Sequence, residues 1–271
     1  MISMNSGFVE SQGVKIHYLT DDCNDPKKVT LLFVPGVMMP AWIWEKQLAY
    51  FSKNFRVVAM EPRSQGDSGQ SSEGHDAFSM AKDIKTLVDT LNLQPLVLIG
   101  WSIGVPQVVN YVAHFDSKGV IGLVLIDGIV GLDPSLPFYQ SMVDYWSQFQ
   151  MDRIPQTRAF VDLIFKQPQT AEYLEKLIKT AMRTPTNTVM TLLYNYMLQD
   201  FRALLPDIEV PTWIATIEGP RLEYMQAMND LLPNSRFEIF KAAGHALFVD
   251  QPERFNHLLE SFIEGLKKEN V

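Results

Sequence analysis

Short runs of aliphatic and β-branched residues recur along the chain and alternate with longer stretches of helical spacing. Nearly continuous apolar runs, bounded by Gly, Pro or Asp, are typical of strands buried on both faces. The helical stretches between them include 77–91 and 105–114. Because strand–helix alternation implies right-handed crossovers, the pattern predicts an α/β fold with a mostly parallel sheet. The predicted strands lie at 29–34, 56–60, 96–99, 123–126, 212–217 and 236–240.

Two regions depart from this alternation. Residues 7–20 alternate between apolar and polar positions, which predicts an antiparallel edge on the sheet. Residues 132–205 contain no convincing buried strand and carry helix-like pieces rich in aromatic residues and Met, interrupted by prolines. We therefore expect a core formed by 1–131 and 206–271, and a helical cap formed by 132–205. The aromatic residues of this cap are expected to form its own core, with room for a subset to line a pocket.

Composition limits the class of protein. The 271 residues are 46% hydrophobic and 20% charged, which suits one large α/β domain or a domain with an insertion. The single cysteine, Cys23, excludes an intramolecular disulfide and a cysteine-based metal cluster. A net charge of −8 offers no basic face to nucleic acid. Neither a secretory signal pattern nor an apolar run of about 20 residues is present, so we expect a cytoplasmic protein without a membrane partner.

A candidate nucleophile follows the strand at 96–99. The sequence there is Gly100-Trp101-Ser102-Ile103-Gly104, followed by a helical pattern, which matches G-x-S-x-G in its strand–turn–helix context. The turn is so tight that side chains at the glycine positions would collide, and the serine is held in a strained conformation with its Oγ exposed at the carboxyl edge of the sheet. The helix N-terminus then favours a developing oxyanion. We predict that Ser102 is the nucleophile.

A serine hydroxyl needs a neighbouring base to accept its proton. His245 follows the last predicted strand in Gly244-His245-Ala246, in a loop at a carboxyl strand end, which is the expected place for chemistry in an open α/β sheet. We predict that His245 is the general base. His257 and His114 fall in helical stretches, so we expect both to be solvated or packed. We expect His17 to lie on an edge strand, and the remaining histidine is His75.

With these motifs the sequence resembles the α/β-hydrolase superfamily along nearly its whole length. The residues that carry the resemblance are Val34-Pro35-Gly36-Val37, Arg63-Ser64-Gln65-Gly66-Asp67-Ser68, the turn around Ser102, and Gly244-His245. The resemblance implies an α/β-hydrolase fold, with the backbone amides of Val37 and Ile103 as the oxyanion hole. Two positions depart from the family pattern: Pro35 replaces a usual His, and Ser64 replaces a usual Gly. Neither position touches the nucleophile.

The acid of the triad has two candidates. Superfamily members usually carry it shortly after the seventh strand, where this chain reads Ile217-Glu218-Gly219-Pro220-Arg221. Some subfamilies, among them certain dehalogenases and the cofactor-independent quinolone-cleaving dioxygenases, carry it after the sixth strand, where this chain has Asp127. The carboxylate holds the imidazole in one tautomer and stabilises the imidazolium, and it can do so from either strand end. We favour Asp127 and keep Glu218 as the second candidate.

These residues favour hydrolysis of a carboxylic ester or lactone through an acyl-enzyme. The aromatic cap favours a small-molecule substrate with an apolar acyl or ring group. No cofactor and no metal are expected, and oligomeric state is left open. The alternative is a cofactor-independent dioxygenase that uses a His/Asp dyad, although Trp101 and Ile103 flank Ser102 where that group carries histidines. A ligand receptor on the same fold is a third hypothesis. A dehalogenase or epoxide hydrolase is disfavoured, because those carry Asp as nucleophile.

Overall fold

The computed structural model describes residues 4–21, 23, 25, 27–115, 118–135 and 137–269. Its centre is an eight-stranded sheet in the order β1-β2-β4-β3-β5-β6-β7-β8. Strands β3 to β8 are parallel, and β1 and β2 run antiparallel to their neighbours. The strands are β1 (Asn5–Ser11), β2 (Val14–Thr20), β3 (Thr30–Val34), β4 (Arg56–Met60), β5 (Leu96–Trp101), β6 (Val120–Ile126), β7 (Thr212–Ile217) and β8 (Ser235–Phe240).

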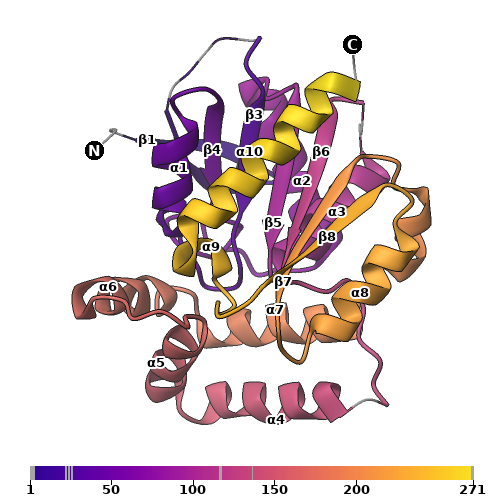
Figure 1. Cartoon of the computed structure of the whole chain (residues 1–271). Coiled ribbons are helices and arrows are strands. Elements are labelled where there is room, and N and C mark those ends of the chain that lie inside the picture. The colour runs from indigo at the N-terminus through magenta and orange to yellow at the C-terminus, as the bar shows by residue number, and fades with distance from the viewer. Residues whose placement is uncertain are drawn as a thin grey trace.

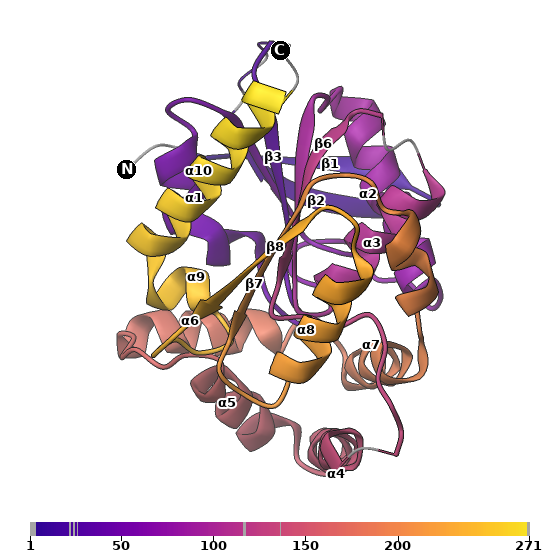
Figure 2. The same ribbon diagram turned by 45° about the vertical axis from the view of Figure 1, so that its right-hand side comes forward.

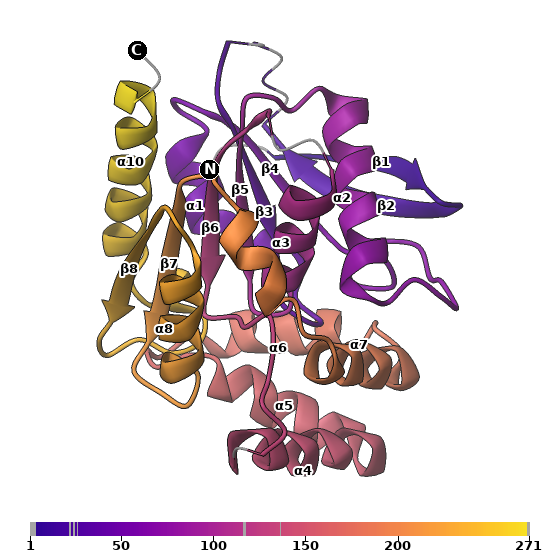
Figure 3. The ribbon, with the colours of Figure 1, turned by 90° about the vertical axis from the view of Figure 1, so that its right-hand side faces the viewer.

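Helices cover both faces of the sheet (Figures 1 and 3). One face carries η1 (Ala41–Trp44), α1 (Glu45–Phe51), α9 (Leu247–Asp250) and α10 (Pro252–Glu269). The other face carries α2 (Ala77–Leu91), α3 (Gly104–His114), η2 (Arg202–Asp207) and α8 (Leu222–Leu231). Among the described helices, none is both long and apolar enough to cross a bilayer. The α/β architecture with a mostly parallel sheet is therefore confirmed.

The central strands are buried as their apolar runs predict. Every residue of β3 and β5 is buried, whereas β8, at the end of the strand order, is mostly half-exposed. The alternation of residues 7–20 predicts one antiparallel edge strand, but the segment forms two strands. It folds back at Gln12 and Gly13, both with positive φ, into a hairpin. The outer strand β1 takes the edge, and β2 is paired on both sides.

A run of four helices separates β6 from β7. These helices are α4 (Pro137–Met151), α5 (Arg153–Leu163), α6 (Ala171–Ala181) and α7 (Thr186–Leu198). In Figures 1 and 2 they lie together beyond the end of the sheet at which the arrowheads of β7 and β8 point. Because parallel strands share this carboxyl edge, the four helices stand over the place where a site is expected. We therefore keep the interpretation of 132–205 as a cap.

Candidate active site

Ser102 occupies the tight turn between β5 and α3. Its φ is +57°, in the left-handed region that non-glycine residues rarely adopt. The glycines on both sides explain how the turn can be so tight. A Cβ at Gly100 would lie 2.7 Å from the carbonyl oxygen of Gly104, and a Cβ at Gly104 would lie 2.7 Å from that of Val34. The strain at Ser102 is therefore maintained by packing that only glycine permits.

His245 is joined to Asp127 and not to Glu218. His245 Nδ1 donates to Asp127 Oδ2 at 2.6 Å, and both residues are buried. Thr216 Oγ1 donates to the other carboxylate oxygen of Asp127 at 2.7 Å. Glu218 is exposed, and among the described residues it has no hydrogen bond. Of the two acids that the sequence leaves open, the structure brings Asp127 to the histidine.

Arg221, at the start of α8, completes the surroundings of Asp127. Its Nη1 donates to Asp127 Oδ2, the oxygen that His245 also uses, at 3.3 Å. Its guanidinium also lies over the ring of Phe138, 5.9 Å from the centroid. Sequence reasoning did not assign Arg221 any role. The sequence feature that could have pointed to Arg221 is its place in the loop after β7, where a cation stands near the usual position of the family's acid.

This arrangement lowers the pKa of both members of the pair. Burial raises the pKa of Asp127, but the charge of Arg221 and the hydrogen bond from His245 outweigh it and hold the pKa below its usual value. Burial lowers the pKa of His245, the positive charge of Arg221 lowers it further, and Asp127 opposes both. At neutral pH the pair is therefore a carboxylate and a neutral imidazole, which is the form a general base needs.

A pH dependence is expected if His245 is the general base that the sequence predicts. As pH falls, a protonated His245 can no longer accept a proton. Because its pKa is lowered from the ordinary 6.5, we expect the acid limb of kcat/KM to have its midpoint below 6.5. Removing the positive charge with Arg221→Met is expected to move this midpoint upward. A pH series of kcat/KM with a neutral ester checks both points.

Arg221→Lys is the matched control, because it retains the charge and should leave the midpoint closer to that of the unmodified protein. A midpoint that stays in place in Arg221→Met would contradict the electrostatic role of this guanidinium.

The turn at Ser102 packs against the loops that carry the other candidates. A Cβ at Gly128 would lie 2.2 Å from the carbonyl oxygen of Ser102, so the chain after Asp127 touches the backbone of Ser102. Trp101 Nε1 donates to the carbonyl oxygen of His245 at 2.9 Å. Between the described side chains of Ser102 and His245 no hydrogen bond is formed, and such contacts are often loose before substrate binds.

Val37 and Ile103 lie beside Ser102 on opposite segments. A Cβ at Gly36, the neighbour of Val37, would lie 3.2 Å from Cβ of Ser102. Within the described part of the chain, neither the amide of Val37 nor that of Ile103 donates to a protein acceptor. The next amide, that of Met38, is instead bound by Gln65 Oε1 at 2.6 Å. Two amides are thus free for an oxyanion, as the resemblance implies.

Asp250 ties the loop of His245 to the cap. Its Oδ2 accepts from the backbone amides of Gly244 and Lys166, both at 2.7 Å, and its Oδ1 accepts from that of Gln167 at 3.2 Å. One carboxylate therefore holds the residue before the histidine and the segment between α5 and α6. Sequence reasoning missed this residue, because nothing in its local pattern separates it from an ordinary helix-end Asp.

We expect Asp250→Asn to loosen both segments. The amide side chain presents an NH₂ group to backbone N–H donors, so about 1–3 kcal/mol of stability is lost. For a protein of this size we expect a fall in Tm of about 2–4 °C per kcal/mol, with a lower kcat because His245 is less firmly held. Thermal unfolding and ester turnover measure the two effects. Asp230→Asn, on the exposed side of α8, is the control. An Asp250→Asn variant with unchanged Tm and kcat would contradict this role.

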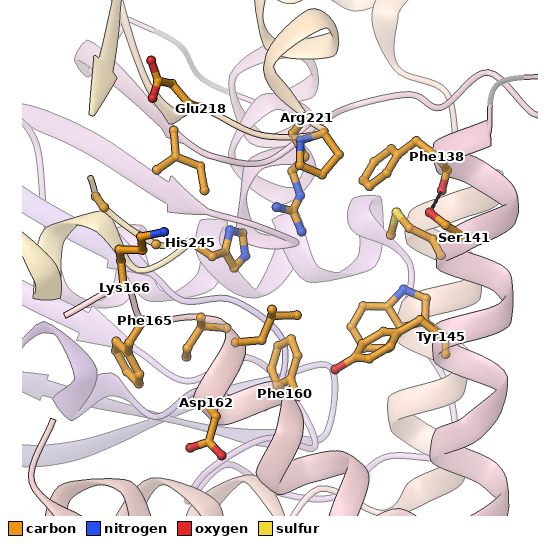
Figure 4. A pocket seen from close by; sticks show the side chains of 18 residues that line it. Phe138, Ser141, Tyr145, Phe160, Asp162, Phe165, Lys166, Glu218, Arg221 and His245 are labelled. Carbon is orange, nitrogen blue, oxygen red and sulfur yellow. Dashed lines mark hydrogen bonds between the residues drawn. The ribbon is translucent and has the colours of Figure 1, made fainter. Parts of the chain in front are cut away.

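A cavity of about 530 Å³ opens beside His245 (Figure 4). Arg221 and the aromatic side chains of α4 and α5 line it, so some aromatics of the cap do face a pocket. Others, such as Phe149, are buried inside the cap. The aromatic lining residues are Phe138, Tyr145, Trp146, Phe160 and Phe165.

The prediction for His17 was wrong. His17 lies on β2, which is an interior strand, and it is buried. Its Nδ1 bonds to Glu61 Oε2 at 2.8 Å, and its Nε2 to Ser6 Oγ at 2.7 Å. The reason is the hairpin, which places another strand outside β2. His114 and His257 are exposed, as expected.

His17, Glu61 and Asp67 could hold a metal ion by distance, since one ligand atom from each lies within 4.8 Å of the others. These atoms already have protein partners. Glu61 accepts from the amides of Ala41 and Asp67 as well as contacting His17, and Asp67 pairs with Arg183. We interpret this cluster as a structural network that anchors β2.

Comparison with known proteins identifies the family. The model of the alpha/beta hydrolase family matches residues 31–258. The chain belongs to the α/β-hydrolase family. The resemblance carried by the motifs around Ser102 and His245 is thereby confirmed, and so is the α/β-hydrolase fold.

Several similar proteins match this α/β-hydrolase over nearly the whole length of both chains. A non-heme haloperoxidase of Rhodococcus erythropolis is 26% identical over 277 residues, which cover 94% of this chain and 98% of the relative. An esterase of Exiguobacterium antarcticum has the same fold, with a TM-score of 0.86, 20% identity, and coverage of 95% and 98%. Est816, described as an N-acyl homoserine lactone degrading enzyme, has a TM-score of 0.79 at 20% identity, with coverage of 94% and 100%. The two solved structures show that the fold is shared.

Proposed function

We propose that this protein is a serine hydrolase that cleaves a carboxylic ester or lactone through an acyl-enzyme. The observation that carries the proposal is the buried Asp127–His245 pair, at 2.6 Å, beside the strained turn of Ser102. A positive φ in the turn between strand and helix is the backbone conformation that exposes a nucleophilic serine at the carboxyl edge of the sheet.

The reaction would proceed in two halves. Ser102 Oγ attacks the carbonyl carbon while His245 accepts the hydroxyl proton, and the amides of Val37 and Ile103 bind the oxyanion. The C–O bond then breaks, and His245 gives its proton to the departing alcohol. Water attacks the acyl-enzyme in the same way, with His245 as base, and releases the acid and the serine. Asp127 stays ionised and holds the imidazolium.

The cavity suits an apolar acyl or ring group. Its walls are mainly apolar and include five aromatic side chains, and a volume of about 530 Å³ falls in the range of small-molecule sites. The names of similar proteins point the same way, since they include esterases and a lactone-degrading enzyme.

Covalent labelling tests the proposal. A fluorophosphonate probe should add to Ser102 and to no other serine, because Ser102 is the serine in the strained turn next to the Asp127–His245 pair. Intact mass and peptide mapping report the site. Hydrolysis of p-nitrophenyl esters should disappear as the label accumulates. A protein that stays unlabelled and inert toward every ester and lactone tried would refute the hydrolase and favour the ligand receptor.

A cofactor-independent dioxygenase is the second candidate. The observation that favours it is the acid after β6, since Asp127 bonded to His245 is the dyad that such an enzyme uses to abstract a substrate proton. Oxygen consumption with a hydroxyquinolone tests it, and this activity should not depend on the hydroxyl of Ser102.

A further inference from the structure

The guanidinium of Arg221 is directed into the cavity beside His245 (Figure 4). Three further lining residues carry charges, and all three are exposed: Asp162, Lys166 and Glu218. In Figure 4 the carboxylates of Asp162 and Glu218 point away from the cavity. Exposed charges are well hydrated and contribute little to selection of a substrate. The cavity is thus lined mainly by apolar side chains, and the guanidinium of Arg221 is a largely buried positive charge among them.

Most hydrogen-bonding capacity of this guanidinium is unused. An arginine carries five N–H donors. Within the described part of the chain, Arg221 makes one hydrogen bond, the 3.3 Å contact with Asp127. Asp127 does not depend on it, because His245 and Thr216 already donate to its two oxygens at 2.6 and 2.7 Å. The side chain of Arg221 is 22% exposed, whereas that of Asp127 is completely buried. Arg221 can therefore face a ligand without leaving Asp127 unpaired.

The positive charge of Arg221 also makes the site more favourable for an anionic ligand. An ionised aspartate with a neutral histidine and serine carries one negative charge, which repels an anion. Here Arg221 cancels that charge at a distance of 3.3 Å. A carboxylate that enters the cavity therefore meets no net repulsion from the site and finds free, fork-shaped donors, which bind carboxylates in a charge-assisted way.

We propose that Arg221 binds a carboxylate of the substrate, so that the cavity selects esters or lactones that carry a carboxylate on an aromatic or other apolar group. The ester or lactone chemistry rests on the proposed function. The binding of the anion does not, because it requires only the cavity and the guanidinium.

A binding experiment tests the anion site without turnover. Ser102→Ala is titrated calorimetrically with phenylacetate, 3-phenylpropionate and 4-phenylbutyrate, and with the matching neutral carboxamides. At least one carboxylate should bind about tenfold or more tightly than its amide, as a charge-assisted contact predicts. The preference should vanish in Ser102→Ala/Arg221→Met and persist in part in Ser102→Ala/Arg221→Lys. Equal binding of acid and amide would overturn the proposal. A preference that survives Arg221→Met would also overturn it, because the carboxylate then sits elsewhere, such as at the oxyanion amides.

A turnover experiment uses a matched pair of esters. Monomethyl terephthalate and methyl 4-carbamoylbenzoate have similar size and differ in one charge. The ratio of their kcat/KM values cancels any effect of Arg221 on His245, because both substrates use the same base. Arg221→Met should lower the anionic-to-neutral ratio about tenfold or more, mainly through KM. Lys166→Met, which removes a charge at the exposed rim, should lower it much less. An equal fall in both variants would show general attraction and overturn the proposal.

The two experiments separate the two proposals. A carboxylate preference that depends on Arg221, without hydrolysis of any ester, would refute the hydrolase and leave the anion site standing. Hydrolysis of both esters with the same ratio in the unmodified protein and in Arg221→Met would refute the anion site alone.

Discussion

Replacing Ser102 with Ala is expected to lower kcat for p-nitrophenyl butyrate by about 10⁴-fold or more, because the covalent step disappears entirely. The remaining rate would come from substrate binding and the free amides of Val37 and Ile103. The loss should appear in kcat with little change in KM, since the hydroxyl is small and stabilises chiefly the transition state. Steady-state kinetics at pH 8, well above the lowered pKa of His245, measures it.

Ser72→Ala is the control for this substitution, because Ser72 is exposed on a loop and lies outside the site. A Ser102→Ala variant that hydrolyses the ester at an unimpaired rate would rule out the acyl-enzyme. Oxygen consumption with a hydroxyquinolone that survives in the same variant would turn the interpretation toward the His245/Asp127 dyad as a proton acceptor.

Much of this fold could be predicted from short apolar runs. The strands β3 to β7 could be recognised because burial on both faces requires nearly continuous aliphatic sequence. Ser102 and His245 could be singled out as candidates for a related reason, since each follows a predicted strand in a short sequence pattern that is typical of a site. The status of His17 could not, because whether a strand lies at an edge depends on pairing with a distant segment, and the alternation of 7–20 gave no sign of the turn at Gln12 and Gly13.

Arg221 and Asp250 stayed hidden for a different reason. Their contacts join segments far apart in sequence: Arg221 reaches Asp127, and Asp250 reaches the residues between α5 and α6. Local sequence periodicity gives no information about such long-range contacts. The choice between Asp127 and Glu218 is of the same kind. The two side chains follow neighbouring parallel strands, and only the three-dimensional path of the loop around His245 decides which carboxylate the imidazole meets.

Asp127→Asn is expected to lower kcat by about 10³- to 10⁴-fold, with folding preserved. The amide is nearly the same size as the carboxylate, so it should fit the buried site and still bond to Thr216. It cannot stabilise the imidazolium, however, and its NH₂ group favours the tautomer of His245 in which Nδ1 accepts and Nε2 carries the proton. That tautomer cannot take the proton of Ser102. The comparison of kcat for Asp127→Asn and the unmodified protein, with circular dichroism to verify folding, tests this expectation.

Glu218→Gln is the matched control, because it makes the same chemical change in the acid that family position alone would suggest. Glu218 is exposed and has no hydrogen bond to His245, so we expect its kcat to stay within about threefold, as for a surface substitution. The reverse pattern, with Glu218→Gln inactive and Asp127→Asn active, would mean that His245 turns toward the end of β7 during turnover. Asp127 would then be a structural acid held by Thr216 and Arg221, and the lowered pKa of its carboxyl would serve stability and not catalysis.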